Sequence, residues 1–188
     1  MKKNLALVLS TAHHEAAHVT IATTLGIQLH RAGIRIDSEG EGIAFYEMET
    51  NNSYRCIEAH VLTLFAGYQA QRYFFRGKVR PATIPRDPID TFDWGQARHL
   101  LSRLPQNDSL NVRKLQGELE KRSLQLVIER WAMIAGLANI LFSKEETPMK
   151  VFAKSPWSNQ ATERFLTGEE VIDTLSHFGI FGSCAEDV

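Results

Sequence analysis

His13-His14-Glu15-Ala16-Ala17-His18 is the stretch of the sequence from which the fold is best derived. It contains a His-Glu-x-x-His motif, in which His14 and His18 lie four residues apart. Residues four apart lie one above the other on the same face of a helix, so both imidazoles can reach one metal ion. Glu15 lies beside that face, where it can hold a metal-bound water and take its proton. The motif therefore predicts a zinc site with Glu15 as the catalytic residue.

The residues around the motif predict the helix that it requires. Apolar side chains recur through residues 4–25, and no proline or glycine interrupts them before Gly26. The same pattern also fits a helix that carries two surface histidines and a solvated glutamate. The motif alone leaves this alternative open, and the rest of the chain has to decide between the two.

The length and composition predict one globular domain over residues 1–188. We expect a metal-site core at 1–104 and a helical extension at 105–188. Hydrophobic residues make up 44% of the chain, which is enough for a substantial core. The net charge of −1 gives no electrostatic reason to expect a nucleic-acid partner.

Several other classes of protein are disfavoured by what the sequence lacks. The two cysteines, Cys56 and Cys184, are too few and too far apart for a disulfide framework or a thiolate zinc site, and they favour a reducing, cytoplasmic setting. No run of about 18 apolar residues occurs, so we expect no membrane span. A phosphate-binding loop of the Gly-x-x-x-x-Gly-Lys-Ser/Thr type is also absent, so we do not expect the chain to hydrolyse ATP.

Turn and cap signals divide the rest of the chain into further elements. Two β-rich segments joined by a glycine-containing loop predict a hairpin, and apolar spacing with cap residues predicts four more helices. Gly67 lies inside the first of these helices, and a glycine in that position indicates the close approach of another backbone. The fold class expected is mainly α (α+β). The expected elements are strands at 31–37 and 42–48 and helices at 54–75, 91–104, 109–142 and 168–178.

The predicted hairpin suggests how a substrate would be held. With only two strands expected, at least one strand edge must be open, and an open edge binds extended peptides through main-chain hydrogen bonds. We expect the strand at 42–48, including Ala44 and Phe45, to border the zinc cleft. The proline-containing loop at 77–92 would form the facing wall. Alternatively, the hairpin only covers the helices.

A catalytic zinc requires a third protein ligand besides the two histidines of the motif. Two carboxylates are candidates: Glu58 on the second helix, and Asp93 at the start of the helix after the proline-containing loop. An acidic residue at a helix N-terminus is also simply a good cap, so the spacing does not decide for Asp93. We expect the remaining histidines to be unrelated to the metal.

Three motifs in order resemble the peptidase domain of FtsH-type AAA zinc metalloproteases. They are the His-Glu-x-x-His stretch, Leu64-Phe65-Ala66-Gly67-Tyr68-Gln69-Ala70-Gln71, and Asp93-Trp94-Gly95-Gln96-Ala97-Arg98. The resemblance covers residues 10–104 and is weaker beyond them. It implies that Zn²⁺ is the cofactor and that Asp93 is its third ligand beside His14 and His18.

The sequence departs from this family at points that matter for activity. Ala17 stands where the family has glycine, a change that a helix tolerates. Gln71 stands where the family has glutamate, so a partner that orients the metal site would carry no charge. Neither the ATPase module nor the membrane anchor of the family occurs in this sequence, so unfolding of substrates is not implied.

The leading prediction is a stand-alone, ATP-independent zinc metallopeptidase that cleaves peptides and unfolded proteins. A separate ATPase or adaptor chain, or a homo-oligomer, would be its expected partners. One alternative is a regulator-cleaving zinc peptidase of the ImmA type, with Glu58 as the third ligand. Another is a catalytically silent, zinc-stabilised binding module, which the loss of charge at Gln71 favours.

Overall fold

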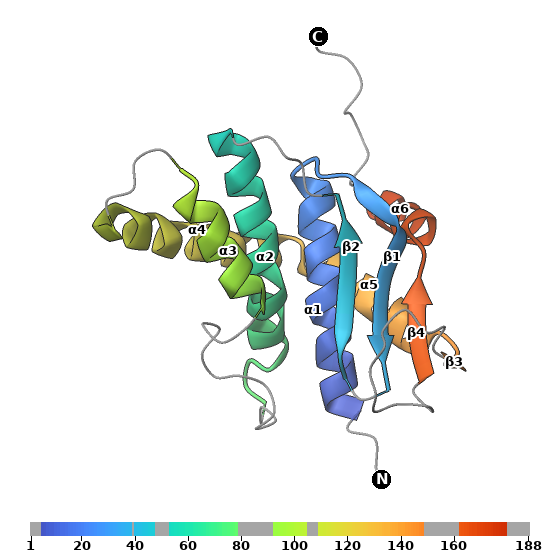
Figure 1. Ribbon diagram of the computed structural model, residues 1–188. Coiled ribbons are helices and arrows are strands. Elements are labelled where there is room, and N and C mark those ends of the chain that lie inside the picture. The colour runs from blue at the N-terminus through green and yellow to red at the C-terminus, as the bar shows by residue number, and fades with distance from the viewer. Residues whose placement is uncertain are drawn as a thin grey trace.

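The structure is a computed structural model that describes residues 5–38, 40–47, 53–78, 92–104, 109–148 and 162–179. In this described part of the chain, there are six helices and a small antiparallel sheet of four strands; the sheet lies to one side of the first helix, with the second, third and fourth helices on the other side (Figure 1). The prediction of a mainly α fold with a small sheet is therefore confirmed. Much of the expected proline-containing loop, residues 79–91, lies outside the described residues.

The helices are α1 (Leu5–Thr24), α2 (Tyr54–Phe74), α3 (Phe92–Ser102), α4 (Ser109–Glu129), α5 (Trp131–Ser143) and α6 (Gly168–His177). The strands are β1 (Leu29–Asp37), β2 (Gly42–Tyr46), β3 (Thr147–Pro148) and β4 (Thr162–Leu166). The predicted bounds of α1, α2, α3 and α6 agree with these to within two residues.

Helix α1 is the central element of the fold. The sheet packs on one of its sides, α2 on another and α5 on a third (Figure 1). It is therefore buried on nearly every face from Val8 to Ala22. Small side chains make this dense packing possible, because fully buried alanines let neighbouring elements approach the helix closely. These alanines are Ala12, Ala16, Ala17 and Ala22.

Helices α2 and α6 begin at the caps that the sequence predicts. Ser53 precedes α2, and its side chain accepts a hydrogen bond from the Cys56 amide. Thr167 and Glu170 form a complete capping box at the start of α6. The predicted inward stripe of α2 is buried throughout. It consists of Ile57, Val61, Leu64, Phe65 and Tyr68.

The expectation of one long helix over 109–142 is wrong. Helix α4 ends before Arg130 and α5 begins after it, and the axes of the two helices differ by 71°. Helix α4 packs mainly on α2, whereas α5 packs mainly on α1, and a straight helix could not serve both partners. Of the described helices, none is long and apolar enough by itself to cross a membrane, and α4 with α5 passes that test only as this bent pair.

The sheet contains more than the predicted hairpin. Its strand order is β2-β1-β4-β3, with every neighbouring pair antiparallel. Sequence reasoning missed β4, because its five residues directly precede a capping box and its main partner β1 lies more than 100 residues earlier. Strand β1 is thus covered on both edges, and β2 lies at the edge of the sheet nearest α1 (Figure 1).

The outer edge of β2 carries the main-chain groups of its even-numbered residues. The Asp37 amide donates to the Glu41 carbonyl, and the Glu47 amide donates to the Gln28 carbonyl. Glu41 and Glu47, which flank β2, therefore form main-chain hydrogen bonds with β1 and its neighbour Gln28, and both have odd numbers. In an antiparallel pair this role alternates along the strand. The N–H and C=O groups of Gly42, Ala44 and Tyr46 therefore point away from β1.

Gly33 in β1 lies against the backbone at the start of α6, and this contact allows a prediction for its substitution. Gly33 has φ +63°, and a Cβ atom there would lie 2.0 Å from the Leu166 carbonyl oxygen. We expect Gly33→Ala to lower the free energy of unfolding by roughly 2 kcal/mol or more, because it combines backbone strain with a clash against backbone. Denaturant unfolding followed by circular dichroism measures the change.

Gly117 provides the matched control for this prediction. It lies inside α4, and a Cβ atom there would meet nothing within 4 Å. Gly117→Ala should raise the free energy of unfolding by about 0.5–1 kcal/mol, because alanine is the better helix former. Equal stability of the two variants would contradict the packing described at Gly33.

Candidate metal centre

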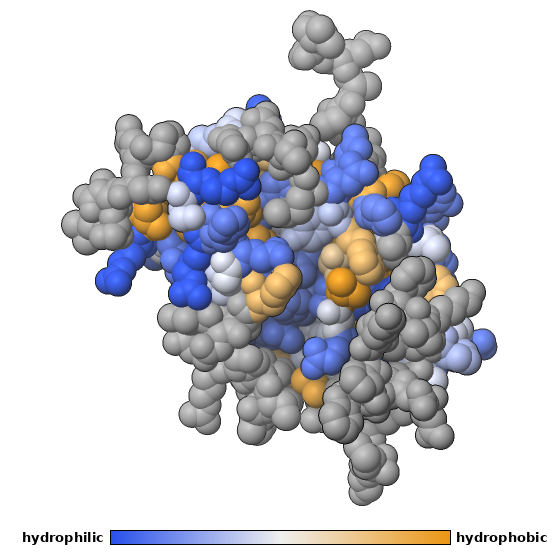
Figure 2. Space-filling view, in the orientation of Figure 1, coloured by the Kyte–Doolittle hydropathy of each residue, from blue (hydrophilic) through white to orange (hydrophobic). Residues whose placement is uncertain are grey.

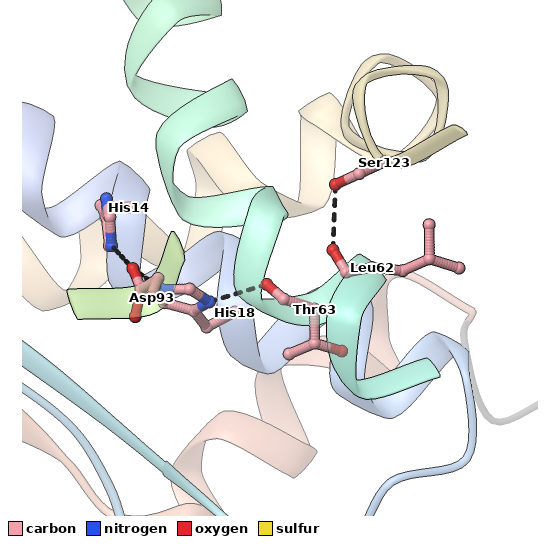
Figure 3. Close-up of polar contacts among 6 residues, drawn as sticks. All are labelled: His14, His18, Leu62, Thr63, Asp93 and Ser123. Carbon is pink, nitrogen blue, oxygen red and sulfur yellow. Dashed lines mark hydrogen bonds and ion pairs between the residues drawn. The ribbon is translucent and has the colours of Figure 1, made fainter. Parts of the chain in front are cut away.

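Three side chains from two helices meet at one point beside α1. Asp93 Oδ2 lies 3.0 Å from His14 Nε2 and 3.3 Å from His18 Nε2 (Figure 3). Among the described residues, these three form the group of histidine, cysteine and acidic side chains that could hold a metal ion. The sequence motif and the later aspartate, which are 75 residues or more apart, are therefore brought together.

Helix α1 presents both imidazoles on one face, and α2 fixes the ring of His18. His18 Nδ1 lies 2.8 Å from the Thr63 carbonyl oxygen, to which it donates a hydrogen bond (Figure 3). This contact leaves Nε2 as the nitrogen that faces Asp93 and can bind a metal. The buried Nδ1 of His14 has no such partner within the described residues. The His14 ring is held instead by its Nε2 contact with Asp93 and by the neighbouring ring of His18.

Helix α3 aims Asp93 at the two histidines. Trp94, the next residue, is buried against α2, with its ring centroid 4.4 Å from that of Phe65. Ala97 and Leu101 continue the buried face at helical spacing. Asp93 therefore lies in the first turn of a firmly packed helix. Because its carboxylate contacts both imidazoles, Asp93 does more than cap the helix.

The glycine inside α2 is required by these imidazoles. A Cβ atom at Gly67 would lie 2.5 Å from His14 Nε2 and 2.6 Å from His18 Nε2. The sequence predicts the close approach of another backbone at Gly67. The atoms that would lie nearest to a side chain there belong instead to the two imidazoles, which extend from α1 toward α2 at the position where α2 has no side chain.

The donor types of the three side chains fit a zinc ion, and so do the distances from Asp93 to the two histidines. Two imidazoles and one carboxylate form a ligand set that catalytic zinc takes, with a further position open. The ligand atoms of a tetrahedral ion with bonds of about 2.0–2.1 Å lie roughly 3.3 Å apart. The separations of 3.0 Å and 3.3 Å between Asp93 and the two histidines are close to that value.

Charge interactions in the metal-free protein are strong at this point. Burial opposes protonation of His18, but the charge and hydrogen bond of Asp93, together with Glu15, raise the pKa of His18 to about 9. Burial also opposes ionisation of Asp93, but the charges and hydrogen bonds of His18 and His14 hold its pKa well below the usual range. A metal bound here would have to displace a proton from His18 at neutral pH, so we expect metal affinity to rise as the pH rises toward 9.

Glu15 lies next to the metal-binding group without being part of it. The residue is buried, and burial raises the pKa of its carboxyl, although the charges of His14 and His18 act in the opposite direction. Its carboxylate rests against the start of β2. A Cβ atom at Gly42 would lie 2.6 Å from Glu15 Oε1, so a side chain at this position would push the carboxylate away from the strand.

An open cavity of about 550 Å³ leads to the three side chains. Hydrophilic residues line the hollow at the middle of this face, and more apolar groups lie on either side of it (Figure 2). The walls include the predicted residues Ala44, Phe45 and Gln71. The remaining lining residues come from α1, the β1–β2 hairpin, α2 and α3; they are Thr11, His14, Glu15, His18, His30, Gly40, Glu41, Gly42, Ile43, Tyr46, Leu64, Phe92, Asp93 and Gln96.

Glu58, the alternative third ligand, lies elsewhere on α2. It forms an ion pair with Arg122 on α4 and does not belong to the metal-binding group. Sequence reasoning also missed parts of the site. The Thr63 carbonyl has no sequence signal at all, whereas Gly42 and Tyr46 fall on the predicted strand beside Ala44 and could have been found by following its alternation.

Comparisons with known proteins do not identify a family. The chain matches no family model, no curated protein and no solved structure. The resemblance to FtsH-type peptidases therefore rests on the three sequence motifs, and the function inferred from them is a proposal.

The contact at Gly67 gives a direct test of the metal centre. We expect Gly67→Ala to lower the affinity for zinc by more than about tenfold, because the added methyl group would lie only 2.5 Å and 2.6 Å from the two imidazole nitrogens and would displace them. The measurement is competition with a chromophoric zinc chelator. The Tm of the metal-free variant shows whether the fold survives.

Gly95 is the control for this test. It lies in α3, two residues from Asp93, and a Cβ atom there would meet nothing within 4 Å. Gly95→Ala should bind zinc as the wild type does. A wild-type affinity in Gly67→Ala would show that the metal is bound elsewhere.

Proposed function

We propose that this protein is a zinc-dependent metallopeptidase that hydrolyses peptide bonds in unstructured polypeptides. The observation that carries the proposal is the position of Glu15. A site that only stabilises the fold needs ligands, whereas this one also has a buried carboxylate that binds no metal and lines the cavity. A carboxylate in that position is what general-base catalysis requires.

The residues of the chain divide the chemistry between them. His14, His18 and Asp93 would hold the zinc, which when bound supplies a Lewis acid and lowers the pKa of water. Glu15 takes a proton from the attacking water and later gives it to the leaving amine. Because burial raises its pKa, Glu15 can keep that proton between the two steps.

The open edge of β2 supports an extended peptide as the substrate. The strand forms one wall of the cavity, and its even-numbered residues point their N–H and C=O groups away from β1. A peptide added there as a further strand would pass the metal centre and would be held through its own main chain, whatever its sequence. Folded substrates would require a separate ATPase or adaptor chain to deliver them.

Two other functions give different outcomes in the same assays. An ImmA-type peptidase that uses Glu58 as a ligand is disfavoured, because Arg122 already pairs with that carboxylate. A silent binding module remains the second candidate, because Gln71 lines the cavity without a charge. It would bind zinc and peptide with no hydrolysis.

Substitution of Glu15 separates the enzyme from the silent module. We expect Glu15→Gln to keep normal zinc content and Tm but to lower the rate of peptide hydrolysis by at least about 10²-fold, because the general base is lost. Hydrolysis of an unstructured fluorogenic peptide measures the rate, with and without chelator.

Glu41→Gln is the matched control, since Glu41 also lines the cavity but is exposed. It should retain most of the activity. Equal rates for wild type and Glu15→Gln would remove Glu15 from the mechanism. Full zinc occupancy with no hydrolysis in the wild type would favour the silent module.

A proline in β2 tests how the substrate is held. Because the Ala44 amide points away from β1, Ala44→Pro removes an outward donor without breaking the sheet. We expect kcat/KM for peptides to fall by about fivefold or more, as loss of one hydrogen bond would cause, at normal zinc content. Steady-state kinetics with the same peptide measures the effect.

Ala44→Gly controls for the loss of the Ala44 side chain, because it keeps the amide donor. It should therefore cleave peptide far better than Ala44→Pro. If Ala44→Pro folds normally and matches the wild type, the hairpin only covers the helices and the substrate binds by another route.

A further inference from the structure

Tyr46, the last residue of β2, points its side chain toward the metal helix. Side chains alternate along a strand, so Gly42, Ala44 and Tyr46 share one face. Gly42 lies against Glu15 and Thr11 on α1, and Ala44 packs against the core cluster that contains α1. Tyr46 therefore faces the same helix, at the end of the strand that borders the cavity.

Two histidine rings fix the position of the Tyr46 ring. Its centroid lies 6.4 Å from the His18 ring, and a further 6.4 Å separates it from the nearly parallel ring of His60 on α2. His60 is buried, and its backbone belongs to the firmly packed α2. The phenol is therefore held next to a metal-binding residue, in a mostly buried position.

The hydroxyl of Tyr46 is a neutral hydrogen-bond donor. Burial and the negative charges of Asp93 and Glu15 raise the pKa of Tyr46 well above its usual range. No hydrogen bond engages this hydroxyl among the residues that the structure describes. Thr11 carries the other hydroxyl on the described cavity wall, and that group already donates to the Gly40 carbonyl, 2.7 Å away.

We propose that the Tyr46 hydroxyl is a catalytic residue that donates a hydrogen bond to the oxygen of the scissile carbonyl as negative charge develops on it. This inference rests on the proposed peptidase function and adds a residue to it. The three metal ligands have no free proton to give, and Glu15 is occupied by the attacking water. A neutral donor at the end of the substrate-binding edge supplies what they lack.

The reaction balances with these groups alone. The water oxygen forms a bond to the carbonyl carbon, one water proton goes to Glu15, and the C=O π pair moves onto oxygen, where Tyr46 donates its hydrogen bond. The C–N bond then breaks as the π pair returns. The amine takes the proton from Glu15 and the second water proton from the new carboxyl group, giving a carboxylate and an ammonium ion. Tyr46 keeps its proton throughout.

Tyr46→Phe removes the hydroxyl and keeps the ring between the two histidines. We expect kcat to fall by about 10²–10³-fold with KM within about twofold, because the hydrogen bond forms mainly in the transition state. Zinc content and Tm should not change. Tyr54→Phe is the matched control, because Tyr54 is an exposed residue at the start of α2 that does not line the cavity.

Inhibitor binding tests the same hydrogen bond without turnover. A phosphinic peptide presents a tetrahedral, anionic group in place of the scissile amide, and its affinity should fall about as much as kcat in Tyr46→Phe. The intact peptide should bind equally to Glu15→Gln and to the double variant Glu15→Gln/Tyr46→Phe. The cobalt-substituted protein without substrate should have the same absorption spectrum with and without the hydroxyl.

Each other outcome overturns the proposal. Wild-type kcat and phosphinic-peptide affinity in Tyr46→Phe would do so and leave the peptidase intact. A changed cobalt spectrum would make Tyr46 a metal ligand, and a lower Tm or lower zinc content would make it structural. If the wild-type protein loaded with zinc cleaves no peptide while Glu15→Gln behaves identically, the proposed function and the role of Tyr46 fall together.

Discussion

The approach of two imidazoles to the backbone of α2 at Gly67 is the contact on which the site depends. His14 and His18 lie on a helix that is buried on nearly every face, so their rings can extend only where a neighbour leaves space. Gly67 leaves that space. The Thr63 carbonyl, one turn earlier on α2, accepts the hydrogen bond that orients His18. One helix thus supplies both the space and the orientation, and helix packing arranges the candidate metal centre in the metal-free protein.

Polar groups inside a packed core are costly unless they are paired, and on α1 most of them are, although His14 Nδ1 and Thr20 Oγ1 have no hydrogen-bond partner among the described residues. Thr11 donates to the Gly40 carbonyl and His13 contacts the Leu9 carbonyl. The two histidines of the candidate metal centre are paired with Asp93, whose charge compensates the proton on His18. Without a metal this arrangement is an ion pair, and with one it would be a ligand set. The Nε2 atoms and the carboxylate would therefore have a partner in either state, and a bound metal would not require a different fold.

Local signals account for what the sequence predicts well. The caps at Ser53 and Thr167 and the histidine spacing in α1 act within one or two turns of helix, and the elements they predict are present. The candidate for a third ligand could not be chosen in this way. Asp93 and Glu58 are equally plausible as isolated carboxylates; the packing of Trp94 on Phe65 places Asp93 beside the two histidines, whereas Glu58 pairs with Arg122. The break between α4 and α5 at Arg130 and the pairing of β4 with β1 also depend on segments far away in the sequence. Local hydrophobic periodicity carries no information about such partners.

The two edges of the sheet differ in a way that bears on binding. Beyond β4 lies β3, which has two residues, one of them Pro148, and short strands with proline are poor templates for a further strand. Strand β2 has five residues and no proline, and its outer edge, which pairs with no other strand in the described part of the chain, borders the cavity. Because β4 covers the far side of β1, the hairpin is anchored and β2 stays at the edge. Strand β4, which was not predicted from the sequence, therefore keeps β2 at the edge of the sheet beside the candidate metal centre.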